Sequence, residues 1–314
     1  MQLIENMDQI KTPFKNAVFT TGNFDGVHKG HQSLCSQVIK KAGNIDGTSV
    51  VMIFDPHPLK TLGKSSPAPI TKRDQKIELI EKTGIDILLR IKFDKTFASI
   101  TALDFIKNIL VKKIGIKAII TGEDYSFGKN KAGNIKLLKE QGKKFGFETI
   151  ISEWKNDPDS ENKRISSTQI RKIVMEAKFE KAMKLLGRYY QIRGKVIKGR
   201  ERGGSKLGFP TANIKLHDEL CPKSGVYAVF VETTFGNFQG VANIGFSPTF
   251  GDNMFTIEVH ILDFNHDIYN TRIRVNIVKR LRDEKKFDSI EQLSNQIRQD
   301  IKTAEDILRN NDVA

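Results

Sequence analysis

Two histidines, His28 and His31, stand close together in the segment TTGNFDGVHKGH at residues 20–31. A short apolar run precedes the segment, and an amphipathic pattern typical of a helix begins near Gly30. The free N–H groups at a helix start favour phosphate, and the missing Cβ of Gly30 permits a close approach. Two imidazole donors could then stabilise the charge that develops at phosphorus during in-line attack. The segment predicts a nucleotide triphosphate site, and the alternative is a strand–turn–helix junction with two polar caps.

A second phosphate-binding element is indicated by ISSTQIR at residues 165–171, which opens another helical pattern. The hydroxyls of Ser166, Ser167 and Thr168 could cap that helix, and Arg171 lies one turn later, where it could pair with phosphate. Taken by itself, this segment is better interpreted as an ordinary Ser/Thr helix cap.

A glycine-rich loop, GRERGGSKLGFPTANI at residues 199–214, joins two β-rich runs. It lacks GxxxxGK[ST] and GxGxxG, but its glycines and basic residues could fold over phosphates with backbone N–H groups. Thr211 and Asn213 alternate on the strand expected after Pro210, so their side chains should point the same way. A hydroxyl and an amide oxygen suit a hard cation such as Mg²⁺ that is shared with substrate phosphates. A basic hairpin loop is the alternative interpretation.

One carboxylate stands on a predicted strand, Glu258 in TIEVHILDF. Ile257, Val259 and Ile261 alternate with it, so Glu258 faces away from the apolar side. To act as a general base it would have to reach a substrate hydroxyl. The alternative is a solvated strand carboxylate.

The elements that must position these residues differ between the two halves of the chain. The first half alternates buried strand patterns with amphipathic helical segments, which predicts a parallel sheet covered on both faces. Ligands of such sheets bind at the carboxyl ends of the strands. The expected strands are 17–20, 49–54, 86–91, 117–121 and 148–152, and the expected helical segments are 30–42, 72–83, 101–113, 131–145 and 167–186.

The pattern changes near Leu186 and Gly187, where β-like runs with turn signals begin. FGN at residues 235–237 indicates a hairpin connection. An amphipathic segment at residues 289–309 closes the chain. We expect an antiparallel β-barrel with a terminal helix, and hence two domains, residues 1–186 and 187–314. The expected strands are 190–197, 226–234, 238–244, 256–263 and 271–280.

The composition of the 314 residues, 39% of them hydrophobic, allows two buried cores. No apolar run approaches the roughly 18–20 residues of a membrane-spanning helix, and the first residues lack the pattern of a secretory signal. The cysteines Cys35 and Cys221 are far apart, which argues against a disulfide framework and predicts a cytoplasmic protein.

The net charge of +14 is concentrated in the first half. Residues 1–187 hold 32 Lys and Arg against 21 Asp and Glu, a balance of +11, whereas the remainder has +3. Such a field suits a polyanionic ligand, from a nucleotide triphosphate to a nucleic acid, although a solubilising surface explains it equally well.

Taken in order, the motifs resemble those of one enzyme family over residues 15–310. GNFDGVHKGH, ISSTQIR, FDPHP (54–58) and GEDYSFGKNKAGN (122–134) resemble the adenylyltransferase half of bacterial bifunctional riboflavin kinase/FAD synthetases. GFPTAN, GVYAV, VANIGFSPTFG, EVHILDF and RLRDEKKFDSIEQL are similar to the riboflavin kinase module of the same enzymes. The resemblance implies a Rossmann-like nucleotidyltransferase domain followed by a kinase barrel.

The resemblance also implies roles for particular residues. Glu258 would deprotonate the ribityl hydroxyl in the kinase, and His28 and His31 would be the catalytic pair of the adenylyltransferase. Tyr125 stands where the family usually has Phe, and both pack beside aromatic ligands. In the adenylyltransferase, ATP would be bound by Asn23, Asp25, His28, Gly30, His31, Ser167, Thr168 and Arg171, and the flavin by Phe54, Pro56, His57, Pro58, Asp124, Tyr125 and Phe127. In the kinase, ATP would be bound by Gly199, Lys206, Gly208, Pro210, Thr211 and Asn213, with Thr211 and Asn213 also holding Mg²⁺.

The implied function is phosphorylation of riboflavin to FMN and adenylylation of FMN to FAD, with ATP and Mg²⁺. The alternatives are a monofunctional FAD synthetase with one decayed site, another nucleotidyltransferase with an unrelated barrel, and a basic flavin- or RNA-binding regulator on the same fold. We expect small-molecule substrates, no membrane and no nucleic acid, because no RNA-recognition signature is present. The sequence leaves the oligomeric state open.

Overall fold

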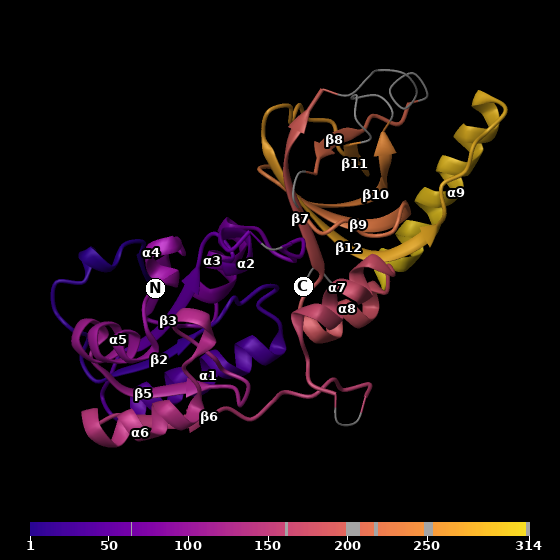
Figure 1. Cartoon of the computed structure of the whole chain (residues 1–314). Helices are drawn as coiled ribbons and strands as arrows, with labels where there is room; N and C mark the ends of the chain where they lie inside the picture. The colour runs from indigo at the N-terminus through magenta and orange to yellow at the C-terminus, as the bar shows by residue number, and fades with distance from the viewer. Residues whose placement is uncertain (64, 161–162, 199–207, 217–218, 248–253, 312–314) are drawn as a thin grey trace. The chain divides into compact units, whose positions relative to one another are not determined.

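The computed structural model describes residues 1–63, 65–160, 163–198, 208–216, 219–247 and 254–311. Its contacts divide the chain into two compact units, Met1–Ser166 and Ser167–Ala314 (Figure 1).

The first unit is built on a parallel sheet, as the alternating pattern predicts. Within the described residues the sheet has six strands in the order β1-β4-β3-β2-β5-β6. The direction of winding reverses at β2, because β3 lies on one side of it and β5 on the other. The carboxyl ends of β2 and β5 therefore flank a switch point, where sheets of this kind bind ligands. The strands are β1 Gln2–Ile4, β2 Ala17–Thr21, β3 Ser49–Phe54, β4 Ile87–Ile91, β5 Ile116–Thr121 and β6 Glu148–Ile151.

Helices cover both faces of this sheet (Figure 1). Val38 of α1 (Lys29–Asn44) and Ile80 of α3 (Arg73–Glu81) pack with Val18 on one face, which we call the α1 face. Residues of the π-helix η2 (Phe105–Ile114) and of α6 (Ile135–Phe145) pack with Phe19 on the opposite face, the η2 face. The shorter elements are η1 Met7–Gln9, α2 Pro58–Thr61, α4 Lys95–Ala98, α5 Ala102–Asp104 and η3 Lys129–Lys131.

Two local features of this unit differ from the sequence expectation. Strand β1 was not expected; it has three residues and pairs with β4 at the sheet edge, too short to give an alternating signal. The helix expected from residue 131 begins instead at Ile135, because the Asn134 side chain accepts a hydrogen bond from Leu137 N–H at 3.0 Å and caps the helix there.

The second unit holds a closed antiparallel barrel, also as predicted. In the described residues its strands follow the order β10-β11-β8-β7-β12-β9, and β9 and β10 form the hairpin expected at residues 235–237. The strands are β7 Tyr190–Ile197, β8 Ala212–Lys215, β9 Gly225–Thr233, β10 Gly236–Ser247, β11 Met254–Ile261 and β12 Arg272–Arg282. The terminal helix α9, Ile290–Arg309, packs Ala304 and Leu308 against the outer side of the barrel.

The helical stretch expected at residues 167–186 is two helices, α7 (Ser167–Met175) and α8 (Phe179–Leu186). The break lies at Ala177, whose φ of 56° leaves the helical region. The Phe179 ring contacts the ring of Tyr227, at a centroid distance of 5.6 Å. Both helices thus group with the barrel, although the sequence analysis assigned them to the first domain. The functional boundary at Leu186 stays a prediction.

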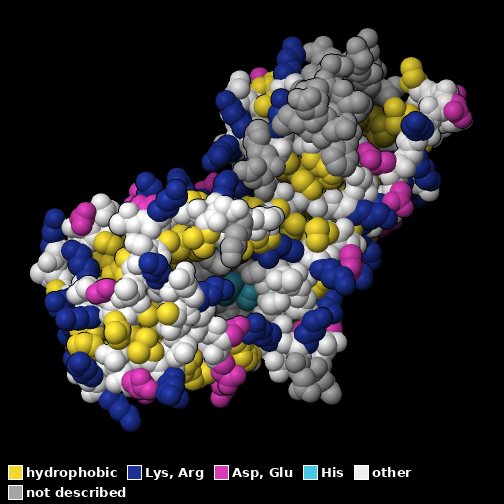
Figure 2. All heavy atoms as spheres, viewed as in Figure 1, with side chains coloured by type: hydrophobic (Ala, Val, Ile, Leu, Met, Phe, Trp, Pro, Cys, Tyr) yellow, Lys and Arg dark blue, Asp and Glu magenta, His cyan; other side chains and the backbone are white. Residues whose placement is uncertain are grey.

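The basic charge of the first unit is dispersed on the face that Figure 2 presents. Lys and Arg side chains lie scattered there among hydrophobic and other side chains, without forming a continuous stripe.

Candidate functional site

The histidine pair lies directly after the carboxyl end of β2. His28 is the N-cap of α1, and its Nδ1 accepts a hydrogen bond from the His31 backbone N–H at 3.3 Å. The two imidazoles stack, with centroids 3.7 Å apart and planes inclined by 16°. Because Nδ1 of His28 accepts, a neutral His28 carries its ring hydrogen on Nε2. The predicted start of α1 near Gly30 is confirmed.

The turn that presents these histidines is held by a buried carboxylate. Phe24 and Val27 are both buried although their φ angles, 46° and 39°, are left-handed, which costs on the order of 1–3 kcal/mol each. Asp25 accepts hydrogen bonds from the N–H groups of Ile70 and Thr71, at 3.1 and 3.2 Å. Asp25 thereby ties the turn to the segment before α3, and its role as an ATP ligand stays a prediction.

The pKa of His31 lies well below its ordinary value. Burial is the largest cause, followed by the neighbouring His28 and Lys76, which disfavour a second positive charge. The Lys76 ammonium also donates to the carbonyl oxygen of the exposed residue Asn23 at 2.9 Å. The buried Nδ1 of His31 has no hydrogen-bond partner within the described part of the chain. His31 is therefore neutral at pH 7.

Gly30 leaves room for the His28 imidazole. A Cβ at Gly30 would lie 3.1 Å from Nδ1 of His28 and 3.7 Å from the carbonyl oxygen of Ile165. The first residue of ISSTQIR thus lies beside the histidine motif. Ser167, Thr168 and Arg171 lie in the first turns of α7, which belongs to the second unit. Their approach to the histidine pair stays a prediction.

The residues predicted on the flavin side are joined by a row of aromatic rings on the η2 face. Phe54, the last residue of β3, contacts Phe97 at a centroid distance of 5.4 Å, and Phe97 contacts Phe105 at 6.3 Å. Phe105 then contacts Phe127 at 5.5 Å, and Tyr125 stacks on Phe127 at 5.3 Å. Burial raises the pKa of the Tyr125 hydroxyl well above its ordinary value. The structure therefore connects Phe54 with Tyr125 and Phe127, which the chain separates.

His57, between Pro56 and Pro58, is a helix cap. Its Nδ1 accepts a hydrogen bond from Leu59 N–H at 3.2 Å, at the start of α2. This contact fixes the ring beside the end of β3. A flavin contact by His57 or the two prolines stays a prediction.

Two residues that the sequence analysis missed surround Asp124. Nη2 of Arg164 donates to the Asp124 carboxylate at 2.9 Å, and the Arg164 guanidinium lies 4.2 Å from the ring centroid of Trp154. The only signal for Arg164 was its place directly before ISSTQIR, and Trp154 had none beyond being the single tryptophan.

The kinase residues form a row across neighbouring strands of the barrel. Glu258 on β11 pairs with Asn213 on β8 and with Asn243 on β10. Directly paired residues share one face of a sheet, and Ile257 and Val259, fully buried, point to the other. The predicted orientation of Glu258 is thus confirmed. Asn243 was missed, and its buried Oδ1 has no hydrogen-bond partner among the described residues.

The pKa of Glu258 is raised, first by burial and second by the carboxylate of Glu284. Glu284 lies over the strand beside this row, since a Cβ at Gly245 would be 2.4 Å from its Oε1. Gly245 follows Asn243 on the same face of β10. Such a shift makes a carboxylate a better general base, because its pKa moves closer to neutral pH.

The start of β8 is anchored by His260, two residues beyond Glu258. Nδ1 of His260 lies 2.8 Å from the carbonyl oxygen of Pro210, and the Phe209 ring meets the His260 ring edge to face at 5.6 Å. Pro210 is thereby fixed directly before Thr211. Gly208 has a φ of 81°. Gly199 and Lys206 lie outside the described residues.

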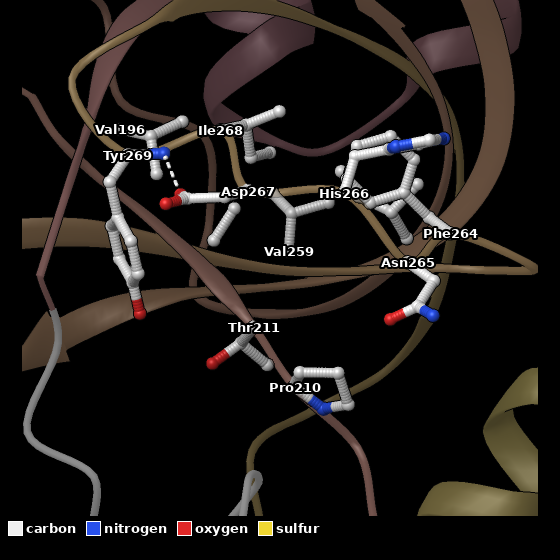
Figure 3. A pocket seen from close by; sticks show the side chains of 12 residues that line it. Val196, Pro210, Thr211, Val259, Phe264, Asn265, His266, Asp267, Ile268 and Tyr269 are labelled. Carbon is white, nitrogen blue, oxygen red and sulfur yellow. Dashed lines mark hydrogen bonds between the residues drawn. The ribbon is translucent and has the colours of Figure 1, made fainter. Parts of the chain in front are cut away.

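A cavity of about 320 Å³ opens beside Thr211 (Figure 3). The segment after β11 forms much of its wall, where the Asp267 carboxylate accepts a hydrogen bond from Tyr269 N–H at 2.8 Å. Its lining joins apolar strand residues, Val196 and Val259 among them, to polar side chains such as Asn265. The sequence analysis missed this cavity, because the contributing loop has no motif.

The described residues contain no cluster of three or more His, Cys, Asp and Glu side chains suited to a metal ion. The donor set around Asn213 nevertheless fits Mg²⁺, which is commonly held by one or two protein oxygens together with substrate phosphates. Asn243 lies in the same row, and its Oδ1, which has no hydrogen-bond donor among the described residues, is a further oxygen that could face the cation. Thr211 contributes a hydroxyl at the cavity.

None of the helices in the described part of the chain is long and apolar enough to cross a membrane. Cys35 and Cys221 are free thiols, and burial raises the pKa of Cys35 to about 12.

The switch point of the sheet carries the histidine pair and the barrel carries the Glu258 row, which together define a two-domain enzyme of the nucleotidyltransferase type with a second catalytic module. The chain belongs to the family of bifunctional riboflavin kinase/FMN adenylyltransferases. A family model described as FAD synthetase matches residues 10–169, and one described as riboflavin kinase matches residues 186–308.

Relatives match along nearly the whole chain. The bifunctional riboflavin kinase/FMN adenylyltransferase of Buchnera aphidicola subsp. Schizaphis graminum is 42% identical, over 96% of this chain and 97% of its own. The protein of the same name from Escherichia coli K12 is 36% identical over 97% of each chain. A crystal structure described as a macrolide-efflux protein from Streptococcus pneumoniae has a TM-score of 0.86 and 34% identity, covering 97% of this chain and 98% of that one.

Proposed function

We propose that the barrel unit transfers the γ-phosphoryl group of ATP to the 5′-hydroxyl of riboflavin, giving FMN and ADP. The sheet unit then joins the AMP part of a second ATP to FMN, giving FAD and pyrophosphate. The observation that carries the proposal is that each unit has its own group of polar side chains suited to phosphate chemistry. These are His28 with His31 in the sheet unit and Glu258 with Asn213 in the barrel unit.

In the kinase step, Glu258 accepts the proton of the ribityl hydroxyl as its oxygen attacks the γ-phosphorus. The raised pKa of Glu258 strengthens it as a base. Thr211 and Asn213 would hold Mg²⁺, which when bound neutralises phosphate charge. We assign the adenosine part of ATP to the cavity beside Thr211, whose apolar strand residues and polar loop residues suit a nucleoside.

In the adenylyltransferase step, an FMN phosphate oxygen attacks the α-phosphorus of ATP and the bond to pyrophosphate breaks. The attacking phosphate is already ionised, so no strong general base is needed. His28 and His31 stabilise the growing negative charge as N–H donors, His31 in its neutral form, assisted by the N–H groups at the start of α1. The aromatic row that ends at Tyr125 offers ring faces beside which the isoalloxazine could pack.

Riboflavin, FMN and ATP are then the partners of this protein, and a reducing cytoplasm is a compartment that suits its two free thiols. The direct test is to incubate the protein with riboflavin, ATP and Mg²⁺ and to separate the flavins by chromatography. We expect FMN and FAD. Unchanged riboflavin would overturn the kinase assignment, and FMN without FAD would overturn the adenylyltransferase assignment.

A further inference from the structure

Trp154 is the single tryptophan of the chain and is 42% exposed, which is unusual for so large an apolar ring. It follows β6 closely, and the edge of its indole rests on Gly122, the residue directly after β5. A Cβ at Gly122 would lie 2.5 Å from Cη2 of the indole. The indole thus occupies space that only glycine leaves open.

A cation covers one side of this ring. The Arg164 guanidinium lies 4.2 Å from the Trp154 ring centroid, and the Asp124 carboxylate holds that guanidinium at 2.9 Å. Arg164 and Asp124 are both exposed, with 45% and 62% of their side chains accessible. An ion pair this exposed contributes little to the stability of the fold. We therefore infer that it serves to orient the indole.

The Trp154 platform, meaning Trp154 with Gly122 and Arg164, lies at the same sheet edge as the histidine pair. Ser152 N–H donates to the carbonyl oxygen of Thr121 at 2.8 Å, which joins the ends of β5 and β6. Gln37 of α1 donates to the Ser152 hydroxyl at 3.0 Å, so the helix that begins at the histidines also touches this edge.

The platform belongs to the α1 face of the sheet. Ala118 and Ile120 of β5 pack on that face, and Gln37 of α1, which covers it, donates to Ser152, two residues before Trp154. The aromatic row with Phe54 and Tyr125 packs on the η2 face. The predicted flavin residues Phe54, Tyr125 and Phe127 are thereby on the face opposite to the predicted ATP residues around His28. The platform is on the side of the ATP residues, and it also contacts Asp124, which was predicted on the flavin side.

We propose that Trp154 is a purine-stacking residue of the adenylyltransferase site, where its indole packs against the base of the ATP that donates AMP. This inference rests on the proposed adenylyltransferase function. An exposed indole whose orientation is fixed by a guanidinium matches the way proteins hold a nucleobase by its π-face. Since the stack forms with ATP in the ground state and persists in the transition state, it lowers KM and leaves kcat unchanged.

Because Trp154 is the single tryptophan, its fluorescence reports on this position alone. ATP added without flavin should change the emission saturably, with a midpoint near the KM for ATP in FAD formation. The change should persist in Asn213→Asp, which alters the proposed kinase ligand, and should be reduced in Gly122→Ala, whose Cβ displaces the indole. Emission that stays constant at ATP concentrations supporting FAD formation would overturn the proposal.

Kinetics give an independent test on the full-length protein. Trp154→Ala should raise the KM for ATP in FMN-to-FAD conversion about tenfold, equivalent to about 1.4 kcal/mol, with kcat within about twofold. Trp154→Phe should restore most of the affinity for ATP. Riboflavin phosphorylation should be unchanged in both variants. As a control, Leu103→Ala, which truncates another exposed apolar side chain of this unit, should have no effect. An unchanged KM in Trp154→Ala would overturn the stacking role alone, whereas a wild-type protein that makes no FAD would overturn the proposed function and this inference with it.

Discussion

The imidazole of His31 lies flat against that of His28, with 3.7 Å between the ring centroids, and the pKa of His31 is lowered in consequence of its burial and of its neighbours His28 and Lys76. Two imidazolium ions so close together would repel each other strongly. His31 therefore meets a substrate uncharged, and the phosphates bring the negative charge.

The titration of His31 tests this description. NMR of the imidazole should give a pKa below the ordinary value of about 6.5. Lys76→Met removes one positive neighbour, so the charged form becomes less unfavourable and the pKa of His31 should rise. A His31 that titrates at its ordinary value in the wild-type protein would contradict the buried, stacked arrangement.

Substitution of Gly30 by Ala should impair the adenylyltransferase selectively. The new Cβ would lie 3.1 Å from Nδ1 of His28 and would push the ring from its place. The ring has to move by a few tenths of an ångström. Because a misplacement of about 1 Å can cost on the order of 100-fold in rate, FAD formation should fall by about tenfold while riboflavin phosphorylation continues.

Gly43 in the same helix provides the matched control. A Cβ there would meet nothing within 4 Å, so Gly43→Ala should leave both activities intact. Equal losses in the two variants would mean that the effect comes from the helix and not from His28.

The pH dependence of the kinase step should follow Glu258. A base works only when ionised, so kcat/KM should fall as the pH drops through its raised pKa. Glu284→Gln removes the second cause of the shift, lowers the pKa of Glu258 and should move the acid limb to lower pH. Glu284→Asp keeps the charge and should keep the limb near its wild-type position. A limb that is identical in Glu284→Gln and wild type would exclude this coupling.

A buried ion pair should contribute strongly to the stability with which α9 packs on the barrel. Arg282 on β12 donates to the Asp300 carboxylate through Nε and Nη2, at 2.9 and 2.7 Å, with the side chains 17% and 7% exposed. Asp300→Ala leaves the guanidinium without its partner and should lower the free energy of unfolding by about 3 kcal/mol. Thermal unfolding followed by calorimetry measures this, and Asp306→Ala, on an exposed position of the same helix, should change it by no more than about 0.5 kcal/mol.

Local patterns were sufficient to predict the parallel sheet, the barrel and the start of α1. The apolar runs and their spacing determine these elements, and the position of His28 before an amphipathic helix indicates its capping role. The orientation of Glu258 followed from strand alternation alone, because a residue on a strand has only two faces to choose from.

Contacts between distant segments could not be predicted in this way. Arg164 meets Asp124 across 40 positions of the chain, and the Glu284 carboxylate reaches Gly245 from the segment after β12. Such pairs depend on the paths that the loops take after the strands. The periodic pattern of apolar residues does not predict those paths. The break at Ala177 was also missed, because a non-glycine residue with positive φ leaves no signal in composition.

The most direct test of two separate sites on one chain is to follow flavin products in His28→Ala and Asn213→Asp. His28→Ala should convert riboflavin to FMN and stop there. Asn213→Asp should leave riboflavin unphosphorylated but still convert added FMN to FAD. If either substitution abolished both conversions in a protein whose circular dichroism and melting temperature match the wild type, the assignment of one reaction to each unit would be contradicted.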